Sequence, residues 1–171
     1  KRSMEWLGRL EDTVFLGQAV AVPGTAMSNT LVSVPEERKF ELPVAEEMQM
    51  GMAIGLALEG YVPITIYPRW NFLLLAVNQL VNHLDRIPEI SKGRYKPKVI
   101  IRTGIGSQSP LHPQSQHIGD FSEAFKLMLN NVQVITLEEP DQIFTAYQNA
   151  YNREDGVSSL IVEYGDYYNE K

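Results

Sequence analysis

Two neighbouring glutamates begin a segment that is rich in small residues. Glu46 and Glu47 open the stretch AEEMQMGMAIGLALE at residues 45–59, whose apolar residues recur at helical spacing. The helix dipole stabilises a carboxylate at a helix start, and most such acids lie on the surface. Here the apolar segment LPVA precedes the pair, so we expect a helix start that is partly closed to water. Because burial favours the neutral form of a carboxyl, such a group suits proton exchange with a bound base.

Two histidines lie in a long loop at residues 104–119. His112 and His117 belong to the sequence GIGSQSPLHPQSQHIG. Long loops in compact domains are often functional, and a histidine there can exchange a proton near neutral pH. A polar surface loop is the alternative interpretation. No third ligand accompanies the two histidines, so we predict no metal site.

Three aromatic residues follow a β-branched apolar run. Tyr67, Trp70 and Phe72 come directly after VPITI. Aromatic residues at a strand end usually pack in the core, but they also provide a flat wall for a heteroaromatic ring. The chain contains no glycine-rich dinucleotide or phosphate loop and no serine nucleophile elbow.

The elements that position these residues alternate between short apolar runs and longer helical patterns. This alternation predicts an α/β fold with three layers, in which helices cover both faces of a mostly parallel sheet. Ligands of such sheets bind beyond the carboxyl ends of the strands, where the loops at residues 17–30, after residue 67 and at 104–119 meet. The predicted strands are residues 13–17, 62–67, 98–103, 132–137 and 159–163, and the predicted helices are residues 45–59, 72–86, 120–130 and 141–152.

Length and composition exclude several classes of protein. The 171 residues fit a single domain, residues 1–171. The net charge of −6 lacks the basic footprint of a nucleic-acid binder, so we expect no nucleic-acid partner. The longest apolar stretch, residues 72–77, is too short to cross a membrane. The absence of cysteine excludes disulfides and a cysteine nucleophile and suits a cytoplasmic protein.

Several segments, taken in order, resemble a known family. FELPVAEEMQMGMAIGLALEGYVPI, YPRWNFLLLAVNQLVNHLDRI, KPKVIIRTGIG and SQHIGDFSEAF are similar to successive parts of the pyrimidine-binding domain of transketolase-like thiamine diphosphate enzymes. The greatest similarity is to the beta subunits of 2-oxo acid dehydrogenases, which act on pyruvate, branched-chain 2-oxo acids or acetoin. The resemblance covers residues 11–163 and implies the thiamine diphosphate-binding fold.

The resemblance assigns roles to four residues beside the cofactor. Glu46 matches the family's cofactor-activating glutamate, which bonds a ring nitrogen of the aminopyrimidine, and Glu47 is the competing candidate. Phe72 matches the aromatic residue that stacks on the pyrimidine. Val44 and Pro68 match residues that line its pocket.

The catalytic histidine of the family has two candidates in this sequence. His117 fits best, because Gln116 precedes it and the helix containing Phe121 and Phe125 follows. His112, in Ser-Pro-Leu-His, resembles the transketolase form of the loop and is the rival. The residues that follow His117 depart from the family pattern.

The resemblance also implies a partner. The family holds Mg²⁺ and the diphosphate at a Gly-Asp-Gly motif on a different domain, and this sequence has no such motif. We therefore expect the motif to come from an alpha-type subunit or from a further part of the same protein, and we expect a lipoyl acyltransferase as a further candidate member of the assembly. The chain alone is expected to form a homodimer, and a heterotetramer with its partner. The C-terminal domain of the beta subunits is expected to be absent.

The resulting hypothesis is the pyrimidine-domain subunit or fragment of a thiamine-diphosphate-dependent 2-oxo acid dehydrogenase. One alternative is ketol transfer by a split transketolase or an enzyme like deoxyxylulose-phosphate synthase, in which Arg69 and Arg102 would meet a sugar phosphate. A second alternative is a non-catalytic interaction or regulatory domain.

Overall fold

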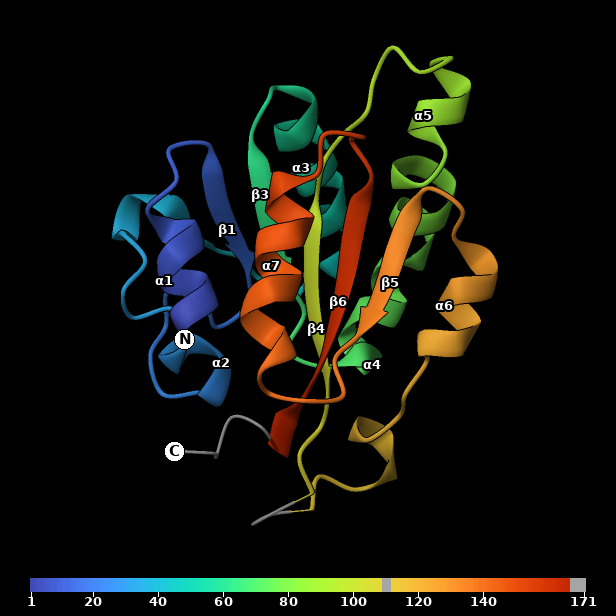
Figure 1. Cartoon of the computed structure of the whole chain (residues 1–171). Coiled ribbons are helices and arrows are strands. Elements are labelled where there is room, and N and C mark those ends of the chain that lie inside the picture. Colours follow the sequence, from blue (N-terminus) through green and yellow to red (C-terminus); the bar gives the residue numbers. More distant parts are fainter. Residues whose placement is uncertain (109–111, 167–171) are drawn as a thin grey trace.

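The protein is built on a parallel sheet. The computed structural model describes residues 1–108 and 112–166, and within them a sheet of six strands has the order β2-β1-β3-β4-β6-β5 (Figure 1). Every pair of neighbouring strands runs parallel. Helices lie on both faces, so the predicted three-layer α/β fold is confirmed.

The sequence predicts the strands well wherever they are buried. In β1, β3 and β4 every residue is buried, because helices cover both faces of the central strands. Strand β2 was not predicted, because it is only three residues long and its sequence, Lys-Phe-Glu, is mostly polar. It lies at one edge of the sheet and β5 lies at the other. The strands are β1 (Thr13–Gly17), β2 (Lys39–Glu41), β3 (Val62–Ile66), β4 (Ile100–Ile105), β5 (Val132–Thr136) and β6 (Ser158–Tyr164).

Two apolar cores fill the space between the sheet and its helices. One core packs α3, α4 and α6 against the sheet, and the other packs α1, α2 and α7 against the opposite face. Figure 1 shows α7 and α1 on the near side, with α3 behind the strands. The short helices α1, α2 and α5 were not predicted. The α-helices are α1 (Arg2–Gly8), α2 (Ala26–Asn29), α3 (Glu46–Leu58), α4 (Trp70–Leu73), α5 (Ile87–Ile90), α6 (Ser122–Met128) and α7 (Gln142–Asn152).

The segment predicted as one helix over residues 72–86 is helical but irregular. It begins two residues earlier with α4 and continues as a 3₁₀ turn, η2 (Leu74–Ala76), and a π-helical segment, η3 (Gln79–Leu84). Two further 3₁₀ turns, η1 (Glu36–Arg38) and η4 (Ser115–His117), lie in the loops before β2 and α6.

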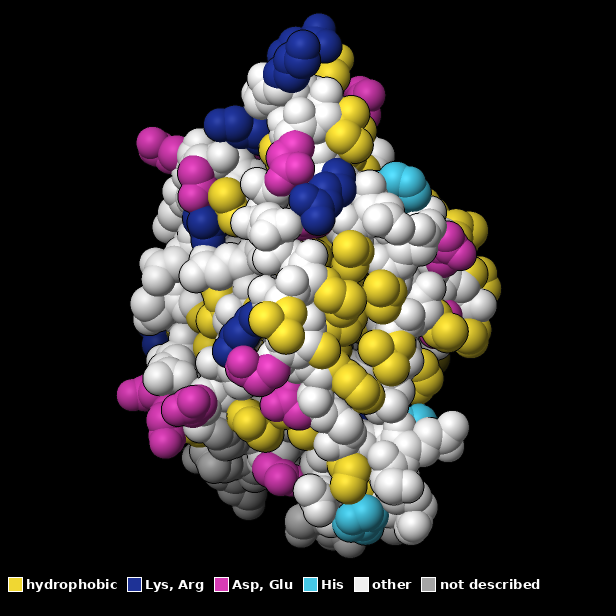
Figure 2. All heavy atoms as spheres, turned by 90° about the vertical axis from the view of Figure 1, so that its right-hand side faces the viewer, with side chains coloured by type: hydrophobic (Ala, Val, Ile, Leu, Met, Phe, Trp, Pro, Cys, Tyr) yellow, Lys and Arg dark blue, Asp and Glu magenta, His cyan; other side chains and the backbone are white. Residues whose placement is uncertain are grey.

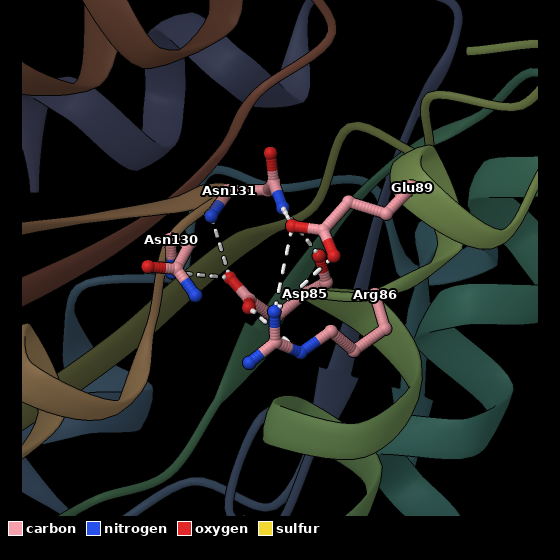
Figure 3. A network of polar contacts seen from close by, with 5 residues as sticks. All are labelled: Asp85, Arg86, Glu89, Asn130 and Asn131. Carbon is pink, nitrogen blue, oxygen red and sulfur yellow. Dashed lines mark hydrogen bonds and ion pairs between the residues drawn. The ribbon is translucent and has the colours of Figure 1, made fainter. Parts of the chain in front are cut away.

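A buried carboxylate fixes the end of this helical segment (Figure 3). Asp85 is fully buried, and its Oδ1 accepts bonds from the backbone N–H groups of Asn130 (2.9 Å) and Asn131 (2.6 Å). Arg86 lies beside Asp85 and Glu89, with 3.8 Å between its Nε and Asp85 Oδ2. The network therefore ties the end of η3 to the turn between α6 and β5.

Within residues 1–108 and 112–166, no helix combines the length and the apolar character needed to cross a membrane. The expected cytoplasmic location stays a prediction.

Candidate functional site

Helix α3 begins at the carboxyl edge of the sheet with a buried glutamate. Glu46 is its first residue and is 3% exposed. One turn later, Gln49 Nε2 donates to Thr65 Oγ1 (2.9 Å) and to the carbonyl of Ile66 (2.9 Å). These bonds attach the first turns of α3 to β3, so the position of Glu46 relative to the strand ends is fixed.

Two side chains from other strand ends contact Glu46. Gln18, which follows β1, donates from Nε2 to Glu46 Oε1 over 3.1 Å. The hydroxyl of Tyr67, which follows β3, donates to the backbone carbonyl of Glu46 over 3.2 Å. Burial raises the pKa of the Tyr67 phenol, so the hydroxyl stays protonated and keeps this bond. Glu46 is thus held both at its backbone and at one carboxyl oxygen.

The neighbouring glutamate lies in a different environment. Glu47 is exposed, and its Oε1 accepts long bonds from Asn78 Nδ2 (3.4 Å) and Gln79 Nε2 (3.3 Å). Successive helix residues point about 100° apart, which places one glutamate against the sheet and the other toward η3.

An open apolar groove of about 860 Å³ runs past Glu46 between α3 and the η2–η3 segment. Several apolar side chains there are unusually exposed, among them Met48 at 45% and Leu75 at 62%. A Cβ built on Gly51 or Gly55 would meet no atom within 4 Å, so neither glycine is required by packing within the chain. The groove is lined by Ala45, Glu46, Glu47, Met48, Gly51, Met52, Leu75 and Gln79.

The exposed apolar surface extends beyond this groove. Figure 2 views the side of the molecule that carries α5 and α6 and shows hydrophobic side chains gathered across its middle. Leu74 of η2 is 37% exposed, and Leu127 of α6 is 89% exposed. A gathering of exposed apolar side chains is typical of a surface that another chain covers.

The structure brings the predicted aromatic and histidine residues together at a second place. The rings of Phe72 and His117 lie 5.9 Å apart with 36° between their planes. His117 Nδ1 is buried and has no hydrogen-bond partner among the described residues. The backbone at His117 lies close to Gly106, where a side chain would collide with the carbonyl of His117, so this approach requires glycine.

The remaining predicted site residues are dispersed. Val44 is 76% exposed, Pro68 is half-buried after β3, and His112 is exposed in the loop. Neither Phe72 nor His117 is among the described residues that line the groove beside Glu46. Among the described residues, the structure therefore joins Glu46 to Gln18 and Tyr67, and it joins Phe72 to His117.

The other two aromatic residues are part of the core. Tyr67 and Trp70 are fully buried, and the Trp70 ring packs against Phe121 and Phe125 at centroid distances of 6.2 and 4.8 Å. Of the three aromatic residues predicted as a possible wall, only Phe72 is partly open to solvent. His83, on η3, is exposed and lies 2.6 Å from Gln79 Oε1.

The structure corrects one candidate for sugar-phosphate binding. Arg102 is 2% exposed on β4, and its guanidinium donates two bonds to Glu163, at 3.1 and 2.9 Å, and one to Thr30 at 2.8 Å. It lies on the face of the sheet that α7 covers, because Tyr147 of α7 also donates to Glu163. Arg102 is therefore a structural residue. Arg69, at the start of α4, is half-buried.

Two residues near Glu46 were not predicted. Gln18 and Glu41 each lie directly at a strand end, and Glu41 accepts four backbone N–H groups from the loop after β1. Their position at the carboxyl edge was the only signal in the sequence. Among the described residues, no group of three or more histidine, aspartate or glutamate side chains is arranged to hold a metal ion.

Two known proteins that are similar to this chain are named as beta subunits of dehydrogenases. The chain is 29% identical over 164 residues to the pyruvate dehydrogenase E1 component subunit beta of Cyanidium caldarium, covering 93% of this chain and 46% of that protein. It is 27% identical over 157 residues to the 3-methyl-2-oxobutanoate dehydrogenase subunit beta of Mycobacterium tuberculosis, covering 88% of this chain and 43% of that protein. The chain thus spans slightly less than half the length of these relatives.

A solved structure confirms the fold. The protein described as "Split gene transketolase, inactive beta4 tetramer" superposes with a TM-score of 0.71 at 22% identity, covering 94% of this chain and 48% of that chain. The family described as "Transketolase, pyrimidine binding domain" matches residues 3–168. This match extends over nearly the whole sequence, and the chain therefore belongs to the transketolase pyrimidine-binding domain family.

Proposed function

We propose that this chain supplies the pyrimidine-binding half of a thiamine diphosphate site in a 2-oxo acid dehydrogenase. The observation that carries the proposal is the buried carboxyl of Glu46, which borders an open apolar groove at the carboxyl edge of the sheet. Membership of the family supports the cofactor. The names of the two beta-subunit relatives support the class of substrate.

The residues around Glu46 fit an aminopyrimidine ring. Such a ring needs one acid at a ring nitrogen and apolar walls on its faces. Gln18 already occupies Oε1 of Glu46, and Ala45, Met48 and Met52 supply apolar surface along the groove. Phe72 is our candidate for stacking on the ring, and Val44 and Pro68 are candidates for its edges, in agreement with the roles that the family resemblance implies.

Glu46 would form a hydrogen bond with the ring nitrogen of the aminopyrimidine through its carboxyl group. When bound, thiamine diphosphate supplies the nucleophilic carbon that attacks the carbonyl of a 2-oxo acid. The Glu46 carboxyl is suited to its role because α3 is anchored by Gln49, and because Tyr67 holds the backbone of Glu46 in place. A preorganised acid needs no reorganisation when charge develops on its partner.

His117 is our candidate for proton transfer near the substrate. Its Nδ1 is buried and has no hydrogen-bond partner within residues 1–108 and 112–166, and its ring contacts Phe72, the second proposed cofactor contact. His112 is the weaker candidate, because it is exposed and its Nδ1 accepts a bond from the backbone of Gln114.

The groove beside Glu46 also indicates where a partner would bind. Met48, Met52 and Leu75 expose apolar surface there, and Gly51 and Gly55 leave the helix backbone uncovered. We propose that an alpha-type subunit covers this surface and brings the Gly-Asp-Gly motif that holds Mg²⁺ and the diphosphate. Self-association into a homodimer, a heterotetramer with the partner and docking to a lipoyl acyltransferase extend the same proposal. The similar split transketolase is described as a tetramer, which supports self-association.

Ketol transfer by a split enzyme is the less favoured alternative. Of the two arginines proposed for a sugar phosphate, Arg102 is bound to Glu163 inside the protein, which leaves Arg69. A non-catalytic interaction domain has no need for a buried carboxyl that is fixed at the edge of a groove, so Glu46 argues against it.

Reconstitution tests the proposal. The chain is mixed with a candidate alpha-type subunit that carries the Gly-Asp-Gly motif, and cofactor-dependent decarboxylation of pyruvate and branched-chain 2-oxo acids is compared with ketol transfer from sugar phosphates. We expect decarboxylation only when both chains, Mg²⁺ and thiamine diphosphate are present. Ketol transfer without decarboxylation would select the split-transketolase alternative, and a stable complex without turnover would select the interaction domain.

A further inference from the structure

A glutamate at the end of β2 organises the loop after β1. Glu41 accepts bonds from the backbone N–H groups of Ala19 (2.7 Å), Val20 (2.8 Å), Ala21 (2.8 Å) and Val22 (3.3 Å). Successive N–H groups that converge in this way form a concave anion site, here filled by a carboxylate of the same chain. Ala19 has a positive φ of 55°, which allows the backbone to curl around the carboxylate.

The loop that Glu41 holds begins with the residue that contacts Glu46. Gln18 lies between Ala19 and Gly17. The backbone of Gly17 packs so closely against the carbonyl of Ile66 that a side chain at Gly17 would collide with it. Gly17 also pairs in register with Glu41. The backbone of Gln18 is thus constrained on both sides, and this places its Nε2 at 3.1 Å from Glu46 Oε1.

We propose that Gln18 and Glu41 are positioning residues for the carboxyl of Glu46, an inference that rests on the proposed function. Gln18 holds one carboxyl oxygen and thereby directs the other toward the groove. Its amide suits this role, because it donates to a carboxylate and, turned over, accepts from a carboxylic acid. Glu41 acts through Gln18 by fixing the loop, and it does not itself face the groove.

The bond from Gln18 is not needed to attach α3 to the sheet. Gln49 alone supplies bonds to Thr65 Oγ1 and to the carbonyl of Ile66. Gln18 is only half-buried, and Glu41 lies at the surface. Both residues are thus constrained by polar contacts that lead to Glu46, and a role in core packing does not account for them.

The test follows the Glu46 carboxyl directly in the chain labelled with ¹³C at glutamate Cδ. Its resonance is assigned by its loss in Glu46→Gln. We expect Gln18→Leu and Glu41→Gln each to displace this resonance. Their matched controls are Gln148→Leu, on α7 across the sheet, and Glu37→Gln, an exposed glutamate in the same segment as Glu41. The controls should leave the resonance in place.

Amide hydrogen exchange separates the two steps. In Glu41→Gln, the amides of residues 19–22 should exchange about tenfold faster or more, because their acceptor is weakened. Faster exchange with an unmoved Glu46 resonance would show that Glu41 is only structural and would overturn its assigned role. An unmoved resonance in a folded Gln18→Leu chain would overturn the role of Gln18. If Gln18→Leu does not fold, Gln18→Ala replaces it.

The reconstituted complex gives the second readout. Gln18→Leu should lower kcat about tenfold, the change expected from the loss of one hydrogen bond, with KM for the 2-oxo acid within about threefold. Unchanged kcat would contradict positioning. The spectroscopic result does not depend on catalysis, so failure of the proposed function and failure of this inference are distinguishable.

Discussion

Replacement of Gly51 and Gly55 by alanine should change the stability of the chain and its affinity for the partner in opposite directions. Both glycines lie within α3, and an added Cβ meets nothing within 4 Å at either position. Alanine is favoured over glycine inside a helix by about 0.5–1 kcal/mol at each position. The double variant should therefore be about 1.5 kcal/mol more stable than the unmodified chain. For a domain of this size, that difference raises Tm by about 3–6 °C.

The same substitutions should weaken the partner complex. Glycine lowers helix stability at these two positions, although the chain itself leaves room for a side chain. A close contact between α3 and the backbone of another chain would explain both glycines. Two methyl groups at such a contact should cost about 1–3 kcal/mol of association, or about fivefold to 150-fold in Kd. Urea unfolding of the chain alone measures the first effect, and calorimetric titration with the alpha-type subunit measures the second.

A matched control is available on α7, which packs on the opposite face of the sheet from α3. Asn152 is exposed at its end, so Asn152→Leu adds more volume than Gly51→Ala at a surface on the other side of the sheet. It should leave the affinity for the partner unchanged. If the double alanine variant of α3 gained stability and bound the partner as tightly as the unmodified chain, the proposed docking of the partner on this helix would be refuted.

Three further changes test contacts within the chain. Burial by itself raises the pKa of the Glu41 carboxyl, but the N–H groups bonded to it outweigh burial and hold the pKa below its usual value. Because Glu41 is exposed and solvent screens its charge, Glu41→Gln should cost only about 0.5–1 kcal/mol near pH 7, and the difference from the unmodified chain should shrink as the pH falls below about 4. Arg102→Leu should cost about 3–5 kcal/mol and leave Glu163 buried without its ion pair, whereas Arg102→Leu combined with Glu163→Leu should recover much of that loss. Asp85→Ala should cost about 3 kcal/mol, because the backbone N–H groups of Asn130 and Asn131 lose their acceptor. Urea unfolding at several pH values measures all three, and an unchanged free energy of unfolding would contradict the role given to that contact.

The buried strands were predictable, because a strand that is covered on both faces needs apolar residues at successive positions. The runs VPITI and VIIRT are mostly apolar and β-branched, with Pro63 and Arg102 as exceptions, and this pattern is typical of a central parallel strand. Strand β2 could not be predicted, because an edge strand of three residues carries no such pattern. The irregular helix after Trp70 was predicted as regular, because hydrophobic spacing does not distinguish a π-helical segment from an α-helix.

The candidate site was only partly predictable, for a different reason. Glu46 was identified from its place at the start of a small-residue helix and from the family resemblance. Gln18 was missed because its contact with Glu46 joins residues 28 positions apart in the chain. This contact depends on the path of the loop after β1. Glu41 fixes that path by accepting bonds from backbone N–H groups, and the side-chain pattern of the sequence does not predict such bonds.

Hydrogen exchange at the cofactor tests most directly whether Glu46 activates it, as proposed. The complex is reconstituted with thiamine diphosphate, and the exchange of the thiazolium carbon-bound hydrogen with D₂O is followed before any 2-oxo acid is added. Glu46→Gln should slow this exchange at least about a hundredfold, the contribution typical of an acid–base group. Glu47→Gln, the adjacent exposed glutamate, should leave it within about threefold. Exchange at the unmodified rate in a folded, cofactor-bound Glu46→Gln complex would contradict the proposed role of Glu46.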